Sequence, residues 1–279
     1  MDKLDRLPWV AGSTFEAYGT RIGVRVSRPE VLDRVTERLP PGWRRSSSPI
    51  VDRLYSLWVG GTRGRRRGHH LLYAGPFRRA RTFSLDGALE ALESELRQTV
   101  AAFARDRVFV HAGVVGWQGG AILVPGRSFS GKTSLVCELV RAGATYYSDE
   151  FAVLDERGRV FPFAKRLSIR EGAAIRRCSP EDLGGVRGVA PLMVRAVVLT
   201  GYRAGARWRP RRLTPARALL ALLEHTVPVR RRPRSSLRAL EGALSRAVVL
   251  DGVRGEADVA ARALLARLTV EPPSGARAS

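Results

Sequence analysis

The residues best suited to chemistry form one run, Gly126-Arg-Ser-Phe-Ser-Gly131-Lys132-Thr133, which fits G-x-x-x-x-G-K-[ST] at every fixed position. The glycines let the backbone curl until successive N–H groups point at phosphate oxygens. A helix that begins at Lys132 adds its positive N-terminal end, Lys132 reaches the β- and γ-phosphates, and the Thr133 hydroxyl ligates Mg²⁺. The run therefore predicts a site for ATP and Mg²⁺, with these nucleotide-binding residues: Gly126, Ser128, Ser130, Gly131, Lys132, Thr133 and Ser134.

The elements on both sides of this run are those that a phosphate site needs. Ala121–Val124 is short and apolar on both faces, as in a strand covered on two sides, and it leads directly into Gly126. Lys132–Arg141 repeats its apolar residues at helical spacing and is followed by Gly143, a typical helix terminator. Thr145–Tyr147 is the next predicted strand. Strand, loop, helix and strand together predict a βαβ unit of a parallel sheet with a right-handed crossover.

Two acids and one histidine are the candidate partners of the loop. Asp149 and Glu150 follow Thr145–Tyr147, so a parallel sheet would place them at the edge where the loop lies. One carboxylate can then hold Mg²⁺ while the other takes a proton from an attacking hydroxyl; the alternative is a pair of solvated loop acids. His111, in the predicted strand Val108–Val115, is expected to face the γ-phosphate or to serve only in packing.

The three landmarks and their spacing resemble the catalytic half of HPr serine kinase/phosphorylase, of the wider phosphoenolpyruvate-carboxykinase-like group. His111-Ala-Gly precedes Gly126 by fifteen residues, and the acids follow Lys132 by seventeen and eighteen. The resemblance covers Val108–Phe163 well and continues loosely to Leu268. It implies that Asp149 activates the acceptor serine as a catalytic residue beside Lys132. It also implies that Glu150 acts with Thr133 at the metal, and that His111 lies near the transferred phosphate.

The chain also departs from that family. The second acid is Glu rather than Asp, and the Glu-x-Arg-Gly signature is altered to Ile169-Arg170-Glu171-Gly172. Pro228-Val229-Arg230 resembles the arginine-bearing loop that contacts the partner protein, so Arg170 and Arg230 are the candidate contacts for phosphate or acceptor. As a whole the chain resembles the HPr-kinase-related proteins that accompany peptide-tailoring enzymes. The implied acceptor is therefore a peptide or small protein, and HPr itself is not expected.

Charge and composition limit which kinds of molecule the chain is expected to bind. The net charge is +22, yet only three of the 48 basic residues are lysine, namely Lys3, Lys132 and Lys165. We interpret the excess arginine in part as a genome-wide preference, which argues against nucleic acid. A solvated basic surface and a surface for an acidic peptide or protein both remain open. The chain has no long apolar stretch, no secretory signal and no metal-spaced cysteines, so a cytoplasmic enzyme without a membrane partner is expected. An oligomer is compatible with the sequence.

The chain is predicted to be α/β, a P-loop kinase core of the HPr-kinase type with a small N-terminal α/β domain. The predicted domains are residues 1–105 and 106–270, followed by a disordered tail, 271–279. Ser84 is the expected N-cap of a long amphipathic helix near the boundary. The other elements expected in the first domain are a strand at Thr20–Val26, a helix at Val31–Leu39, and a hairpin of Arg53–Val59 and His70–Tyr73 around a mobile loop, Gly60–Gly68.

These observations favour an ATP- and Mg²⁺-dependent kinase that transfers the γ-phosphoryl group to a hydroxyl, expected to be a serine of a peptide or small protein. Three alternatives stay open. They are a small-metabolite kinase on the same core, a non-catalytic nucleotide-binding partner that regulates other enzymes, and a nucleic-acid-dependent ATPase.

Overall fold

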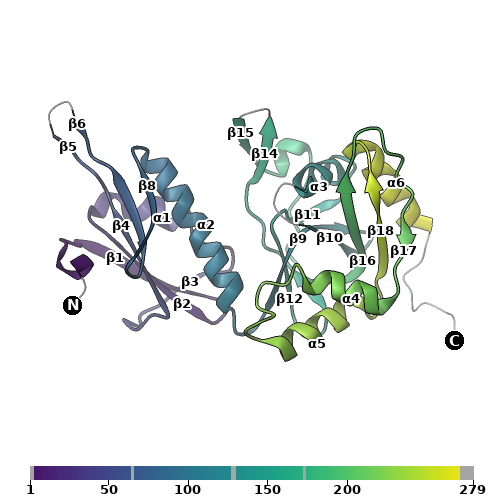
Figure 1. The fold of residues 1–279 in the computed structure, drawn as a ribbon, viewed down its shortest axis with the longest axis horizontal. Helices are drawn as coiled ribbons and strands as arrows, with labels where there is room; N and C mark the ends of the chain where they lie inside the picture. Colours follow the sequence, from purple (N-terminus) through teal and green to yellow (C-terminus); the bar gives the residue numbers. More distant parts are fainter. Residues whose placement is uncertain (1–2, 64–65, 127–129, 172–173, 271–279) are drawn as a thin grey trace. The chain divides into compact units, whose positions relative to one another are not determined.

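The protein has a mixed α/β structure in two compact units, Met1–Asp106 and Arg107–Ser279 (Figure 1). The computed structural model describes residues 3–63, 66–126, 130–171 and 174–270. The tail that the sequence predicts to be disordered, 271–279, lies outside these ranges. Within them, no helix has both the length and the apolar character needed to cross a membrane.

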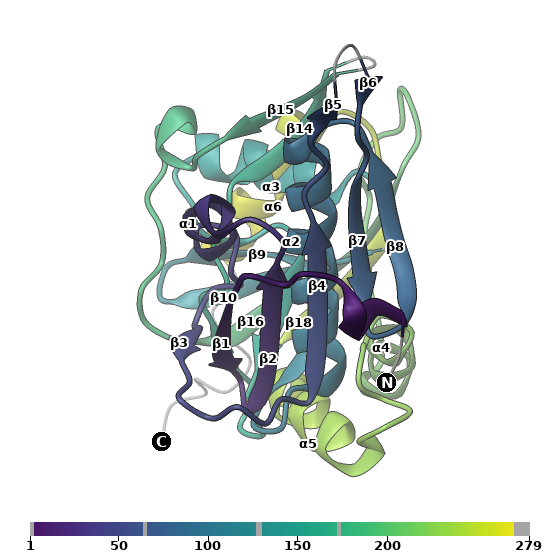
Figure 2. The ribbon, with the colours of Figure 1, turned by 90° about the vertical axis from the view of Figure 1, so that its left-hand side faces the viewer.

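The first unit is a six-stranded sheet with the strand order β3-β1-β2-β4-β7-β8 (Figure 2). Ser84 caps α2 by accepting a hydrogen bond from the Gly87 N–H at 3.2 Å, as predicted, and the helix packs on β7 and β8. The bounds are β1 Ala11–Ala17, β2 Thr20–Val26, β3 Arg44–Arg45, β4 Arg53–Trp58, β7 His70–Ala74, β8 Phe77–Thr82, α1 Leu32–Thr36 and α2 Leu85–Phe103, with short 3₁₀ turns at Lys3–Arg6 and Pro29–Val31.

Sequence patterns gave part of this unit correctly. The predicted strand Thr20–Val26 is β2, and the two predicted hairpin strands are β4 and β7, which pair antiparallel. Strands β1 and β8 were missed, and the predicted helix at Val31–Leu39 is only one turn, α1. The loop Gly60–Gly68 contains a short ribbon of β5 (Thr62–Arg63) and β6 (Arg66–Arg67). Its two ends approach so closely that a Cβ on Gly60 would lie 2.6 Å from the Gly68 carbonyl, which explains the glycine there.

The second unit is built on an eight-stranded sheet with the order β10-β9-β12-β13-β16-β18-β17, and β11 pairs with β9. The sheet is mixed, so the prediction of a parallel sheet was wrong: β9 lies between β10 and β11 and runs antiparallel to both. Because both neighbours oppose β9, β10 and β11 still run in the same direction and end at the same edge. The strands are β9 Val108–Trp117, β10 Gly120–Pro125, β11 Thr145–Ser148, β12 Phe151–Leu154, β13 Arg159–Phe161, β16 Leu192–Tyr202, β17 Arg211–Arg212 and β18 Val248–Arg254.

Helices cover both faces of this sheet. α3 (Lys132–Arg141) and α6 (Ala257–Val270) pack on one face, and α4 (Pro215–Leu223) and α5 (Pro233–Leu244) pack on the other. Successive residues of β10 alternate between the two cores: Ile122 and Val124 pack with α3 and α6, whereas Ala121 and Leu123 pack with α4 and α5. This explains why Ala121–Val124 is apolar throughout.

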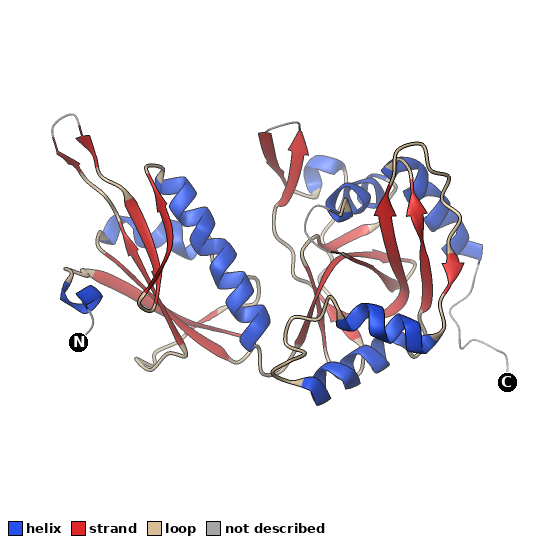
Figure 3. Ribbon diagram, viewed as in Figure 1, coloured by secondary structure: helices blue, strands red, loops and turns tan. Residues whose placement is uncertain are grey.

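A separate two-stranded hairpin projects from the second unit, formed by β14 (Leu167–Glu171) and β15 (Ala174–Cys178) (Figure 3). The sequence patterns predicted no element there. The hairpin is anchored at its base, because Leu167 and Cys178 are buried in the core that contains α3.

Candidate functional site

The loop motif joins β10 to α3, as predicted. Gly131 is the N-cap of α3 and takes the left-handed conformation, with φ +81°, which a glycine adopts without strain. Gly126 donates its N–H to the His111 carbonyl at 3.2 Å, and a Cβ added to it would lie 2.5 Å from the Ser130 hydroxyl. Ser128 lies outside the described residues. Three residues predicted to bind nucleotide lie at the start of α3: Lys132 and Thr133 are half-buried, and Ser134 is exposed.

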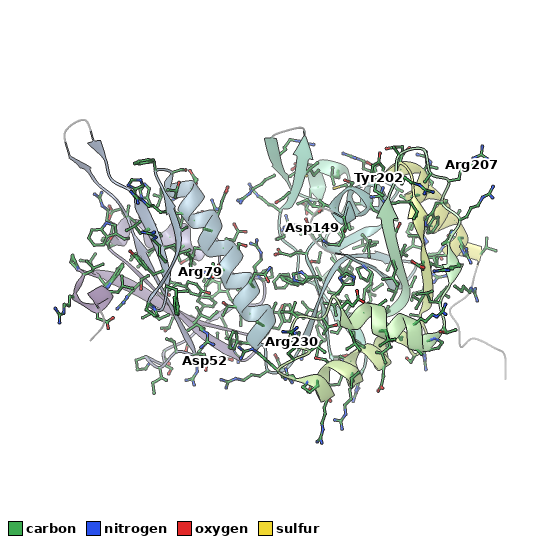
Figure 4. The ribbon with its side chains drawn as sticks, viewed as in Figure 1. Asp52, Arg79, Asp149, Tyr202, Arg207 and Arg230 are labelled. Atoms are coloured by element: carbon green, nitrogen blue, oxygen red, sulfur yellow. The ribbon has the colours of Figure 1, made fainter. Side chains whose placement is uncertain are left out.

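Asp149 and Glu150 occupy the turn between β11 and β12, at the edge where β10 ends (Figure 4). Ser148 shapes the turn, because its buried hydroxyl accepts hydrogen bonds from the N–H groups of Glu150, at 3.1 Å, and Phe151, at 3.0 Å. Asp149 is only 6 % exposed, which argues against a pair of solvated loop acids. A buried carboxylate is costly unless it has partners, so its surroundings matter.

The charges of the loop and of the turn act on one another. Burial lowers the pKa of Lys132. The negative charges of Asp149 and Glu150 raise this pKa again, and the positive charge of Lys165 lowers it. These four side chains therefore form one electrostatic cluster. Opposite charges at a sheet edge, beside the N-terminus of a helix, are suited to hold a polyphosphate and a cation together.

His111 lies beside this cluster. It is opposite Phe151 in the β9–β12 register, and the two rings are in contact, tilted by 36° with centroids 4.7 Å apart. The backbone N–H of His111 donates to the His225 carbonyl at 2.7 Å. Burial lowers the pKa of His111, and the charges of Lys132 and His225 lower it further. The neutral imidazole is therefore favoured near pH 7, a form that can exchange hydrogen bonds with a phosphate or a hydroxyl.

Two further residues, which sequence reasoning missed, contact the Asp149 carboxylate. The Lys165 ammonium lies 3.0 Å from Asp149 Oδ1 and 3.8 Å from Glu150 Oε2. The Tyr146 hydroxyl lies 3.1 Å from the same Oδ1. Burial and the neighbouring Asp149 charge raise the pKa of Tyr146 well above its ordinary value, so the phenol stays a hydrogen-bond donor.

A third missed residue lies on the other side of the loop. Arg254, at the end of β18, is 2 % exposed and donates a hydrogen bond to the Gly131 carbonyl at 2.9 Å. Its guanidinium also approaches the ring of Tyr202, 5.5 Å from the centroid. Burial lowers the pKa of Arg254. A buried positive charge at the N-cap of α3 adds to the attraction that the helix end has for phosphate.

The roles predicted for Arg170 and Arg230 at the phosphate or acceptor are not tested by the described side chains. Arg230 is exposed and lies next to α5 in Figure 4, apart from Asp149 in that view. The side chain of Arg170 lies outside the described residues, although its backbone belongs to β14. Both roles therefore stay predictions.

The oxygen groups at this edge fit the ligand preferences of Mg²⁺, which takes hydroxyl, carboxylate and phosphate oxygens and keeps several waters. Thr133 supplies a hydroxyl and Glu150 a carboxylate. Among the described residues, no group of three or more His, Cys, Asp and Glu side chains could hold a metal by itself. A Mg²⁺ ion here would thus depend on phosphate oxygens and water as well, as in other sites that bind the ion with its nucleotide.

Comparisons with known proteins give a distant similarity in fold. No protein-family model matches the chain, and no curated protein matches it in sequence. Among solved structures it is similar to the HPr(Ser) kinase/phosphatase from Coxiella burnetii, with a TM-score of 0.31 and 13 % sequence identity over 57 % of this chain and 93 % of that one. A similarity at that level shows no family membership and no activity, which must be inferred from the chain's own side chains.

Proposed function

We propose that the second unit is an ATP- and Mg²⁺-dependent kinase that transfers the γ-phosphoryl group to a hydroxyl, a serine of a peptide or small protein. The observation that carries the proposal is the convergence of Asp149, Glu150, Lys132 and Lys165 where β10 and β11 end and α3 begins. A site that only binds nucleotide and Mg²⁺ can use one carboxylate for the metal but has no need of a second one as proton acceptor. Phosphoryl transfer to a hydroxyl needs a group that accepts the proton.

In the proposed reaction the acceptor oxygen attacks the γ-phosphorus while the bond to the β–γ bridging oxygen breaks. The acceptor hydroxyl gives its proton to Asp149, and ADP leaves. Lys132, at the N-terminus of α3, neutralises charge on the β- and γ-phosphates. Mg²⁺, held by Thr133, Glu150 and phosphate oxygens, would screen the charges of the phosphates. His111, favoured as the neutral imidazole, is placed to hydrogen-bond the transferred group.

Charge near the site supports a peptide acceptor over a small metabolite. Arg166, Arg176 and Arg177 are exposed along and beside the β14–β15 hairpin, close in sequence to Lys165. A basic surface of this kind attracts an acidic peptide and has no obvious use for a small molecule enclosed in a pocket. We extend the proposal accordingly to an acidic segment around the acceptor serine.

The test is label transfer from γ-labelled ATP and Mg²⁺ in host lysate, with Lys132→Ala beside the wild type. The proposal expects label on a peptide or small protein, released as phosphoserine on digestion and absent with Lys132→Ala. Label on a metabolite would favour the small-metabolite kinase. Nucleotide binding with no transfer to any acceptor would overturn the kinase proposal in favour of a regulatory nucleotide-binding protein, and hydrolysis stimulated by DNA or RNA would favour the nucleic-acid-dependent ATPase.

A further inference from the structure

Lys165 is the feature of this site that the proposed reaction does not yet use. Its ammonium lies 3.0 Å from Asp149 Oδ1, and the two side chains are only 14 % and 4 % exposed. Lysine is rarely buried to this extent unless it is paired, because removing its charge from water is costly. The pair is thus held by the fold, unlike an exposed ion pair on the surface.

The segment that carries Lys165 is fixed on both sides. Phe163 is fully buried in a cluster with Phe109 and Phe151, and its N–H donates to the Tyr147 carbonyl at 3.1 Å. Leu167, two residues beyond Lys165, is also fully buried. The Lys165 carbonyl lies 3.1 Å from the Tyr146 hydroxyl. Backbone and side chain of Lys165 are therefore placed independently of any ligand.

The choice of lysine is informative in this chain, in which arginine supplies all but three of the 48 basic residues. A guanidinium is a planar fork that tends to bind both oxygens of a carboxylate at once, whereas an ammonium is a compact point charge that can bind one. Here the ammonium binds Oδ1, and so does the Tyr146 hydroxyl. Within the described part of the chain, both side-chain partners of Asp149 thus meet the same oxygen, which leaves Oδ2 for the acceptor.

We infer that Lys165 is a positioning residue that, with Tyr146, fixes Asp149 by Oδ1 so that Oδ2 can take the proton of the acceptor hydroxyl. This inference rests on the proposed function. Lys165 acts through Asp149, so its loss should slow transfer without weakening the binding of nucleotide to Lys132 and the helix end. An arginine at this position should preserve the positive charge, yet its second N–H group should compete with the acceptor hydroxyl for Oδ2.

The first experiment compares Lys165→Arg and Lys165→Met with the wild type and with Lys3→Arg, a lysine of the first unit. We expect Lys165→Arg to lower kcat for phosphoryl transfer at least about tenfold, the size typical of a disturbed proton acceptor. The Kd of ATP·Mg²⁺ should change less than about threefold, since the phosphate contacts are untouched. The unfolding midpoint should shift less than about 4 °C. Lys165→Arg with the wild-type kcat would overturn the inference, because a purely structural ion pair tolerates arginine.

A second measurement tests the pairing without any phosphoryl transfer. With three lysines in the chain, acetylation by acetic anhydride can be followed site by site by mass spectrometry. Asp149→Asn should raise the rate at Lys165 relative to Lys3 by at least about fivefold, since an amine released from the 3.0 Å contact with Asp149 Oδ1 is more accessible to the reagent. An unchanged ratio would overturn the inference. A wild type that transfers label to no acceptor overturns the proposed function, so the two failures are distinguishable.

Discussion

The guanidinium of Arg254 donates a hydrogen bond to the carbonyl of Gly131 at 2.9 Å and so joins the end of β18 to the first turn of α3, 123 residues away in sequence. The contact fixes the N-cap of the helix whose N-terminus we propose to bind phosphate. It also means that the geometry of the loop depends on a strand that sequence motifs do not connect with it.

Gly131→Ala should destabilise the second unit and weaken nucleotide binding. The left-handed backbone costs about 1–2 kcal/mol with a Cβ present, and that Cβ would lie 2.5 Å from an Arg254 nitrogen. We expect the free energy of unfolding in urea to fall by at least about 2 kcal/mol. The matched control is Gly201→Ala in β16, where an added Cβ meets nothing within 4 Å. Equal stability of the two variants would contradict this account of the N-cap.

Arg254→Met should reduce both the affinity for ATP·Mg²⁺ and the stability of the second unit. The variant removes the hydrogen bond to the Gly131 carbonyl, which lowers stability. It also removes a buried positive charge beside the phosphate loop; a charge at a helix end contributes up to about 2 kcal/mol in a partly buried site, which corresponds to a Kd up to roughly thirtyfold weaker. Calorimetric titration with ATP·Mg²⁺ measures the change. Arg262→Met, which breaks an exposed ion pair with Asp258 in α6, should leave the Kd unchanged; an equal effect of both variants would show that only overall charge matters.

Ser148→Ala should impair phosphoryl transfer through the turn that holds the two acids. Two N–H groups lose their acceptor, and each buried unsatisfied donor costs about 1–3 kcal/mol, so the turn should relax around Asp149. The expected outcome is a lower kcat with a nearly unchanged Kd for nucleotide, measured by label transfer and calorimetry. Ser245→Ala removes a hydrogen bond from an exposed serine and serves as the control. A Ser148 variant with full kcat would show that the turn keeps its shape without the hydroxyl.

Acidification should destabilise the folded protein in part through His111. Its pKa is lowered in the fold, so below about pH 6.5, the ordinary value, the unfolded chain binds the proton more readily. The free energy of unfolding should consequently fall as the pH decreases from about 6.5 towards the lowered pKa. Above about pH 6.5, His111 is neutral in both states, so it causes no such loss of stability. His111→Gln should have a shallower dependence on pH than the wild type in urea unfolding. Parallel curves for the two proteins would contradict the assignment.

The sequence predicted the parts of the site that depend on local chemistry. Gly131 and the helix start at Lys132 lie where the motif predicts them, because a tight turn and a helix N-terminus require particular residue types at a fixed spacing; the phosphate role of Lys132 and Thr133 stays a proposal. The predicted helix Lys132–Arg141 has the bounds found in the structure, since its apolar stripe and Gly143 fix both ends. Asp149 and Glu150 were placed at the correct edge although the sheet was wrongly taken as parallel, because β10 and β11 run in the same direction on either side of β9.

The remaining residues of the site could not be found by local pattern. Arg254 lies at the site because β18 has its place in the sheet, and Lys165 because the connection between β13 and β14 passes Asp149. Neither arrangement leaves a periodic signal along the chain. One signal was available for Lys165: in a chain so rich in arginine, a lysine marks a position where a point charge is preferred. The role of Arg230 stays a prediction, because basic runs are so common here that a match to a short motif carries little weight.

The most direct test of the central claim is to measure binding and transfer separately for Asp149→Asn. The amide keeps the size of the side chain and loses the ability to accept the acceptor's proton. We predict a Kd for ATP·Mg²⁺ within about threefold of the wild type and a rate of label transfer to the acceptor lowered by about 10²–10⁴-fold. Transfer at the wild-type rate, or a loss of transfer fully explained by lost nucleotide binding, would contradict the role of Asp149 as the proton acceptor of a kinase.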